Sequence, residues 1–146
     1  MASDDSITQM IFFIASIIVA VTIAGTIIGI TGLMADEMRV KSDNAVSVMG
    51  SSITIVNDPR HVPYENGTIT IYIKNTGELP QSYRDLIIFI DGQYIEFEAD
   101  LVGPGGNTWV TGRVIEISAT LVLGAGDHTA KAILGNGVSD TLDFRL

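Results

Sequence analysis

The sequence predicts an N-terminal hydrophobic α-helix followed by an all-β immunoglobulin-like sandwich. Three observations support this: residues 6–35 contain no charged side chain, the residues after 52 alternate between apolar and polar types, and turn residues recur along that second part. A membrane-spanning helix needs about 20 apolar residues, so the first segment is long enough to cross a bilayer. We expect residues 1–44 to form the transmembrane or assembly helix with its charged stalk, and residues 45–146 to form the head.

The helix carries small residues at helical spacing and ends in a charged stretch. Two of its faces hold them: Ser16, Ala20 and Ala24 on one, and Gly25, Gly29 and Gly32 on the other. Such faces let membrane helices approach closely, although small residues are also common in helices that do not associate. Both interpretations stay open. Self-association with more than one neighbouring helix would account for the presence of two such faces. The stalk, Asp36–Asn44, is expected to extend the helix by two turns.

The head shows the alternation of strands that bury one face. Within Thr68–Lys74 the isoleucines share one face, and Asp91-Gly92 between two apolar runs indicates a tight β-hairpin. Further strands are expected at residues 53–56, 86–90, 94–98, 114–123, 128–134 and 139–146, with turns at 75–77, 104–106, 124–127 and 135–137. About seven or eight short strands with regular turns are typical of an immunoglobulin-like sandwich.

The composition argues against several classes of function. A net charge of −9 leaves no basic surface for a nucleic-acid partner, and the absence of cysteine excludes a cysteine-based metal site or nucleophile. The two histidines, His61 and His128, lack metal-ligand spacing, and we expect both to be exposed turn residues. Trp109 is expected in the core. The sequence therefore predicts no enzyme activity, no metal and no cofactor.

The compartment is indicated by weak and conflicting signals. The acidic start and the long apolar run do not fit a cleaved signal peptide, so we expect the helix to be retained. Arg39 and Lys41 follow the helix, and the distribution of basic residues alone would place the head in the cytoplasm. Asn66-Gly67-Thr68 is a sequon at a turn, so Asn66 is a candidate N-glycosylation acceptor on an outward-facing head.

Four segments together resemble one family: IFFIASIIVAVTIAGT, TIYIKNTGELP, LIIFIDGQYIE and AGDHTAKAILGNGVSDTLDF. In this order they are similar to the archaeal archaellum accessory protein G family (FlaG/ArlG), which is related to archaellins. The resemblance implies a single-pass protein of the cytoplasmic membrane with its head in the pseudo-periplasm, acting in assembly and anchoring of the swimming filament. It implies accessory protein F as partner, with the surface layer or archaellin as further candidates, and it outweighs the basic-residue rule.

Two alternative functions stay open. An archaellin- or pilin-like filament subunit would place the same helix in a filament core, but no basic leader precedes Arg39. A membrane-anchored ligand-binding module would use Trp109 and tyrosines on an exposed face, and a buried Trp109 would contradict it. In the preferred reading the helix is held by membrane lipid, and the sandwich docks a partner through a strand edge or a sheet face.

Overall fold

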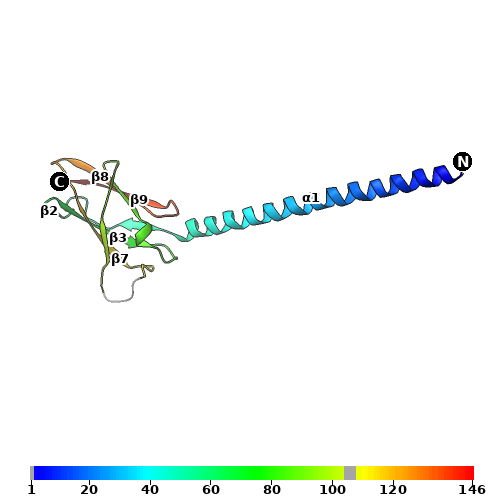
Figure 1. The fold of residues 1–146 in the computed structure, drawn as a ribbon. Coiled ribbons are helices and arrows are strands. Elements are labelled where there is room, and N and C mark those ends of the chain that lie inside the picture. Colours follow the sequence, from blue (N-terminus) through cyan, green and yellow to red (C-terminus); the bar gives the residue numbers. More distant parts are fainter. Residues whose placement is uncertain (1, 104–107) are drawn as a thin grey trace. The chain divides into compact units, whose positions relative to one another are not determined.

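The computed structural model describes residues 2–103 and 108–146, with side chains described from residue 5 onward. The chain divides into two compact units, residues 1–43 and 44–146. The turn expected at residues 104–106 lies outside the described residues. The fold class is the one that the sequence predicts, a long apolar helix followed by an antiparallel β-sandwich (Figure 1).

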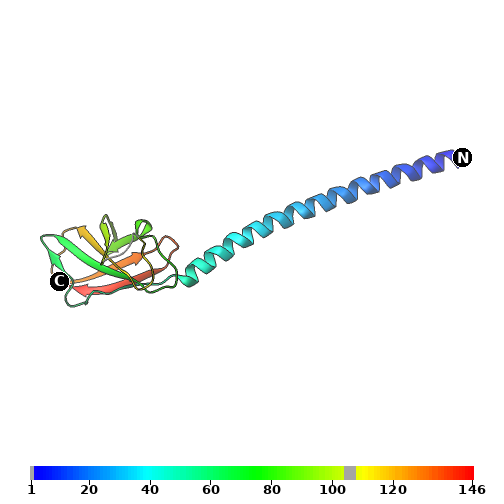
Figure 2. The same cartoon turned by 90° about the horizontal axis from the view of Figure 1, so that it is seen from below.

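The helix α1 (Ala2–Gly50) is one continuous element (Figure 2). Its hydroxyl groups bond to its own backbone: Thr22 Oγ1 donates to the carbonyl of Ile18 at 2.8 Å, and Thr31 Oγ1 donates to that of Ile27 at 2.8 Å. These bonds satisfy the hydroxyls without water, which suits an apolar environment. Every side chain from residue 5 to residue 46 is exposed within this chain, so α1 buries its apolar surface only if something outside the chain covers it.

The helix ends later than the two-turn stalk extension predicts, because the head provides its C-terminal cap. The last helical residue, Gly50, accepts hydrogen bonds on its carbonyl from the backbone N–H groups of Glu78 and Leu79 at 2.9 and 3.1 Å. The final carbonyls of a helix need hydrogen-bond donors from outside the helix, and these two N–H groups serve the last of them, that of Gly50. Asn44–Gly50 therefore belongs to the compact unit of the head.

Two antiparallel sheets form the head. The first has the strand order β1-β3-β7-β6, with β2 also paired to β3, and the second has the order β5-β4-β8-β9. The strands of the described residues are β1 (Ile53–Ile55), β2 (Tyr64–Glu65), β3 (Thr68–Asn75), β4 (Ile87–Ile90), β5 (Gln93–Ile95), β6 (Glu98–Leu101), β7 (Val114–Thr120), β8 (Asp127–Ile133) and β9 (Ser139–Arg145). This topology is that of an immunoglobulin domain, A-B-E-D against C′-C-F-G.

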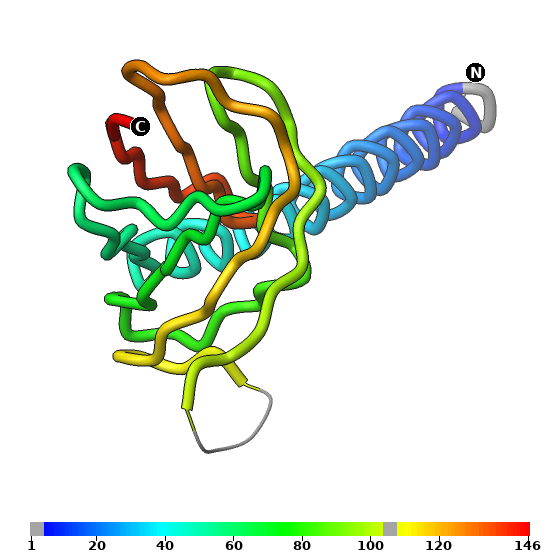
Figure 3. Tube along the Cα trace, turned by 90° about the vertical axis from the view of Figure 1, so that its left-hand side faces the viewer, coloured from blue at the N-terminus to red at the C-terminus, as the bar shows by residue number. Residues whose placement is uncertain are grey.

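The strand expected at residues 94–98 is in fact two strands in different sheets. β5 pairs with β4 in the second sheet, whereas β6 pairs with β7 in the first, and the chain crosses between the sheets at Glu96 and Phe97. This crossing can be followed in Figure 3. Together with the short strand β2, the crossing explains why the described residues contain nine strands where about seven or eight are expected from the pattern.

The core lies between the two sheets. The three inward isoleucines of β3, Ile69, Ile71 and Ile73, face away from water as their alternation predicts. Trp109 is 0% exposed, and its indole Nε1–H donates to the carbonyl of Arg113 at 2.9 Å. The expectation of a core tryptophan is thus confirmed. A buried indole needs such an acceptor, because an unpaired polar group in the core is costly.

Candidate docking surfaces

The two outer faces of the sandwich differ in chemistry. The outer face of the first sheet is polar, with threonine, tyrosine and lysine on β3, carboxylate and hydroxyl side chains on β7, and the carboxylates Glu98 and Asp100 on β6. Asp100 lies opposite Glu116, a like-charge pair that disfavours the local pairing. Burial of the Tyr72 hydroxyl and the neighbouring Glu116 carboxylate raise the pKa of Tyr72. This face is a solvated one.

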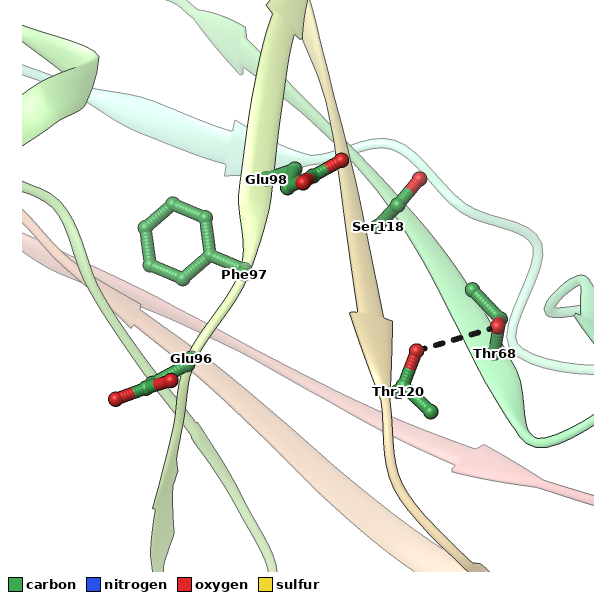
Figure 4. A pocket seen from close by; sticks show the side chains of 6 residues that line it. All are labelled: Thr68, Glu96, Phe97, Glu98, Ser118 and Thr120. Carbon is green, nitrogen blue, oxygen red and sulfur yellow. Dashed lines mark hydrogen bonds between the residues drawn. The ribbon is translucent and has the colours of Figure 1, made fainter.

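A shallow depression lies on this polar face (Figure 4). Its lining residues are Thr68, Glu96, Phe97, Glu98, Ser118 and Thr120. The hydroxyls of Thr68 and Thr120 are 3.5 Å apart, bridging β3 and β7. No base is within hydrogen-bond reach of a hydroxyl among these side chains, and in the described part of the chain no group of three His, Cys, Asp or Glu residues is placed to hold a metal ion.

The outer face of the second sheet is apolar at its centre. One row across the strands places Lys131 beside Phe89 and Phe89 beside Tyr94, and the next row pairs Ile133 with Ile87. Tyr94 is 59% exposed and Ile87 is 39% exposed. The rings of Phe89 and Tyr94 meet edge to face, with centroids 6.3 Å apart. We call these five residues the β4–β8 patch. Contiguous exposed apolar groups of this kind mark interaction sites more often than single ones do.

His128 is not the exposed turn residue that the sequence predicts. It lies on β8, and its side chain is 11% exposed. Its Nδ1 is 2.7 Å from Asp91 Oδ2 and its Nε2 is 2.9 Å from the carbonyl oxygen of Gly124. Neither oxygen can donate, so this arrangement favours a proton on each ring nitrogen, which is the imidazolium form. The hydrogen bond to Asp91, and then that to Gly124, raise the pKa of His128.

Asp91 is the other half of this cluster. The hydrogen bond from His128, followed by that from the Thr129 backbone N–H, lowers the pKa of Asp91. It occupies the first position of the β4–β5 turn at φ 51°, with Gly92 at φ 78°, as a two-residue type I′ turn requires. The arrangement links the β4–β5 turn to the first residues of β8.

His61 and Asn66 lie on the surface, as expected of turn residues. The His61 side chain is 81% exposed and 3.2 Å from Asp58. The backbone N–H of Arg60, and then the His61 side chain, lower the pKa of Asp58. Asn66 is exposed in the β2–β3 turn at φ 52°. A glycosylation enzyme can reach an acceptor in an exposed turn. Glycosylation of Asn66 stays a prediction.

The predicted helix-packing residues all lie on α1. A side chain added at Gly25, Gly29 or Gly32 would meet nothing within 4 Å, and Ser16 Oγ donates to the carbonyl of Phe12 at 2.6 Å. Ala20 and Ala24 are likewise exposed. The stretch from Asp5 to Gly50 is long and apolar enough to cross a membrane by length and composition. That the two small-residue faces pack against neighbouring helices stays a prediction.

Sequence reasoning missed two asparagines that hold loops together. Asn75, expected in a turn, is fully buried at the end of β3. Its Nδ2 donates to the carbonyls of Leu79 and Trp109 at 3.0 and 2.9 Å, and its Oδ1 accepts from Gly77 N–H at 3.0 Å. Asn136 Nδ2 contacts Ser47 Oγ at 3.1 Å and Ser51 Oγ at 2.8 Å. Their residue type was the only signal in the sequence. Asparagine is also common in exposed turns, so its presence does not identify these buried positions.

A family model and a curated relative each match nearly the whole length of the chain. The family model described as archaeal-type flagellin matches residues 3–144. A provisionally named flagella-related protein G of Methanocaldococcus jannaschii is 28% identical over 143 residues, covering 94% of this chain and 92% of that protein. The solved archaellum periplasmic stator protein FlaG of Sulfolobus acidocaldarius is 18% identical with a TM-score of 0.50, covering 64% of this chain and 99% of that one. A solved complex of FlaF and FlaG from the same organism is 18% identical with a TM-score of 0.49, covering 63% of this chain and 87% of that one.

Proposed function

The chain belongs to the archaeal-type flagellin family, and we propose that it is a non-enzymatic structural accessory component of the archaellum. The observation that carries this proposal is the end-to-end match, through helix and head alike, to a relative named flagella-related protein G. The fold agrees, since the solved FlaG structure has the same kind of sandwich. The family resemblance names accessory protein F as the partner, with the surface layer beyond it.

The proposed mechanism is mechanical. The helix α1 anchors the protein in the cytoplasmic membrane, and the sandwich outside the membrane docks a partner. The exposed apolar side chains of α1 support the anchor, because only lipid or other helices would cover them. The two outer faces and the strand edges of the head supply the docking surface. No step of this mechanism involves bond chemistry.

Deletion of the gene followed by complementation tests the role in motility. Cells without this protein should still make archaellins but should not swim, and the wild-type chain should restore swimming on soft agar. Swimming at the wild-type level after deletion would contradict the proposal. Protease added to intact cells tests the orientation separately: the head should be degraded from outside, whereas degradation only after lysis would place it in the cytoplasm.

A filament subunit is the second candidate, favoured by the family description and by a helix that is apolar on all sides. Electron microscopy of the full chain after detergent removal distinguishes the two. Ordered filaments with helices at their core would favour the subunit, and discrete particles would favour the accessory role. The ligand-binding module is contradicted, because its Trp109 is buried.

We further propose that the small-residue faces of α1 mediate self-association. The glycines would let backbones approach closely, since nothing in this chain lies within 4 Å of the position a side chain would take. The double substitution Gly25→Leu and Gly29→Leu should reduce the size of the oligomer in detergent. A matched pair that lies between the two small-residue faces, Val19→Leu and Ile30→Leu, should leave it unchanged. An unchanged oligomer in the glycine variant would discard the proposal.

A further inference from the structure

Three separate parts of the head meet at the ring of His128. Asp91, in the β4–β5 turn, places its Oδ2 2.7 Å from the ring Nδ1. Gly124, in the β7–β8 connection (residues 121–126), places its carbonyl oxygen 2.9 Å from Nε2. Phe144 of β9 lies opposite His128 in the strand register, and the two ring centroids are 5.6 Å apart. The ring therefore joins the β4–β5 turn, the β7–β8 connection and β9.

The β7–β8 connection is attached at both of its ends. At its start, Tyr64 Oη donates to the carbonyl of Leu121 at 3.1 Å and accepts from the backbone N–H of Leu123 at 2.9 Å. At its end, the backbone of Gly126 exchanges hydrogen bonds with that of Leu146, at 3.2 and 3.0 Å. These contacts involve neither a histidine nor a carboxylate side chain, so a change of charge on the ring leaves them in place.

The middle of the connection, Gly124 and Ala125, is held by His128. Within the described residues, the contact of Nε2 with the Gly124 carbonyl is the hydrogen bond that fixes this stretch, and neither residue makes another. A side chain added at Gly124 would meet nothing within 4 Å, so packing at this position does not hold the backbone either. Glycine on both sides of Ala125 gives the backbone a wide choice of conformations once the contact is lost.

The two ring contacts need two protons on one ring. A neutral imidazole carries one N–H, which serves one oxygen, and its other nitrogen then presents a lone pair to the second oxygen. The Asp91 carboxylate is the stronger acceptor, because a hydrogen bond to an ionised group is stronger than one to a neutral carbonyl. Asp91 is also fixed by the backbone N–H of Thr129, which donates to Oδ1 at 2.9 Å. The single proton therefore stays on Nδ1, and the contact with Gly124 is the one that is lost.

The charged groups around the ring set the direction of this change. The hydrogen bond to Asp91, then that to the neighbouring carbonyl, and the charges of Asp91 and Asp127 raise the pKa of His128. Arg145 Nε lies 3.8 Å from Asp127 Oδ1 and offsets part of that second charge. Phe144 of β9 carries no charge, and the β7–β8 connection contains no titratable side chain. The Nε2 contact is therefore complete below the raised pKa and is lost as pH rises through it.

We propose that His128 is a pH-dependent latch on the β7–β8 connection. The doubly protonated ring holds the Gly124–Ala125 backbone, and loss of the Nε2 proton releases that backbone to water while the β4–β5 turn stays in place. The released stretch follows Leu121–Leu123, which line one side of a shallow depression whose other side is β5. The latch thus alters this part of the surface without unfolding the sandwich. The inference goes beyond the proposed function and does not depend on it.

A pH titration of the full-length chain, isotope-labelled and held in one mild detergent, tests the latch by NMR. From about pH 5 to about pH 9, the ring nitrogen shifts of His128 should change from those of an imidazolium to those of the Nδ1–H tautomer. The order parameters of the Gly124 and Ala125 amides should fall with the same midpoint, from about 0.85 to below about 0.6. Those of Asp91 and Thr129, whose backbones are hydrogen-bonded to each other, should stay high.

Three variants identify the groups responsible. His128→Gln removes the titrating ring and should make the order parameters of Gly124 and Ala125 independent of pH. Asp91→Asn removes the charge that favours the second proton, so the transition should occur about one pH unit lower. His61→Gln is the matched control, because its exposed ring also lies beside an aspartate, and it should leave the transition where it is.

A joint transition of the ring and the Gly124–Ala125 backbone, absent from His128→Gln, supports the latch. The proposal is overturned if the ring stays doubly protonated throughout, or if that backbone is equally ordered before and after the ring loses its proton. A neutral ring that keeps its proton on Nε2 while Asp91 loosens, or a transition that moves in His61→Gln, also overturns it. The wild-type titration decides by itself if circular dichroism shows that a variant has not folded. The swimming assay judges the accessory role separately.

Discussion

The helix α1 and the sandwich use the same apolar residue types in opposite ways. Both are rich in isoleucine and both contain valine, alanine and threonine, yet every described side chain of α1 up to residue 46 is exposed, whereas Ile69, Ile71 and Ile73 of β3 are buried. The head hides its apolar side chains against itself because strands place alternate residues on one face. The helix has apolar residues on all sides and needs an external apolar medium.

This difference means that the two regions should respond differently to the same kind of substitution. A change in the head acts on its folding stability, while a change in α1 acts on where the chain resides. Substitutions chosen to be equivalent in chemistry but placed in different regions therefore test the comparison directly.

Trp109→Ala should destabilise the head by about 3–5 kcal/mol, because it removes the largest buried side chain and leaves a cavity. Thermal unfolding followed by near-UV circular dichroism measures the loss, and membrane retention of the chain should not change. Val122→Ala is the control, since Val122 is 95% exposed. A wild-type melting temperature in Trp109→Ala would show that the tryptophan does not support the core.

Ile18→Lys should lower the fraction of the chain that stays in carbonate-washed membranes. A charge near the centre of a membrane helix costs about 2.5–3.5 kcal/mol on insertion scales, and no acidic residue lies nearby on α1 to compensate it. The melting temperature of the head should stay the same. Val122→Lys, the same charge on the head surface, should leave retention intact. Full retention of Ile18→Lys would contradict a membrane position for this part of α1.

Asn75→Ala should cost about 1–2 kcal/mol, because it removes three hydrogen bonds made by a fully buried amide. The Leu79 and Trp109 carbonyls still accept hydrogen bonds from Gln81, and the Gly77 N–H still donates to Ser52, so no group is left without a partner. Urea unfolding of the full chain measures this cost. Asn75→Asp should be destabilising too, since it keeps the acceptor but loses both donated bonds. Asn66→Gly, at an exposed position with φ 52°, is the control. Equal stability of Asn75→Ala would mean that water replaces these bonds.

His128→Gln should cost about 1 kcal/mol near pH 5 to 6, discounted because Asp91 is partly exposed. The pKa of His128 is raised above 6.5, so its stabilising contribution is full below pH 6.5 and is lost as pH rises through the folded-state pKa. The pKa of Asp91 is lowered from 3.8, so its contribution is present above that value and is lost as pH falls further.

The difference in melting temperature between wild type and His128→Gln should therefore be widest between about pH 4 and 6.5 and should close in alkaline solution. His61→Gln is the matched control, with an exposed ring, and its effect on the melting temperature should be smaller than that of His128→Gln. A His128→Gln difference that does not vary with pH would show that the ring is not held as an imidazolium.

Particular residues show how far the sequence predicts the molecule. The alternation in β3 predicts its buried isoleucines, Asp91-Gly92 predicts the turn between β4 and β5, and the uncharged run predicts most of α1. His128 was placed wrongly because its partner Asp91 lies 37 residues away along the chain. Asn75 looks like an ordinary turn residue, and its burial depends on the loop that ends at Trp109.

The division into an apolar helix and a β-rich head follows from the sequence, because the length of an apolar run and the period of the hydrophobic pattern depend only on neighbouring residues. Three features come from the folded arrangement instead. The chain changes sheets at Glu96 and Phe97, and α1 ends at Gly50, whose carbonyl accepts hydrogen bonds from the N–H groups of residues 78 and 79. The apolar rows of β4, β5 and β8 meet on one outer face. These features depend on strand order and register, which bring distant residues together and which no local pattern encodes.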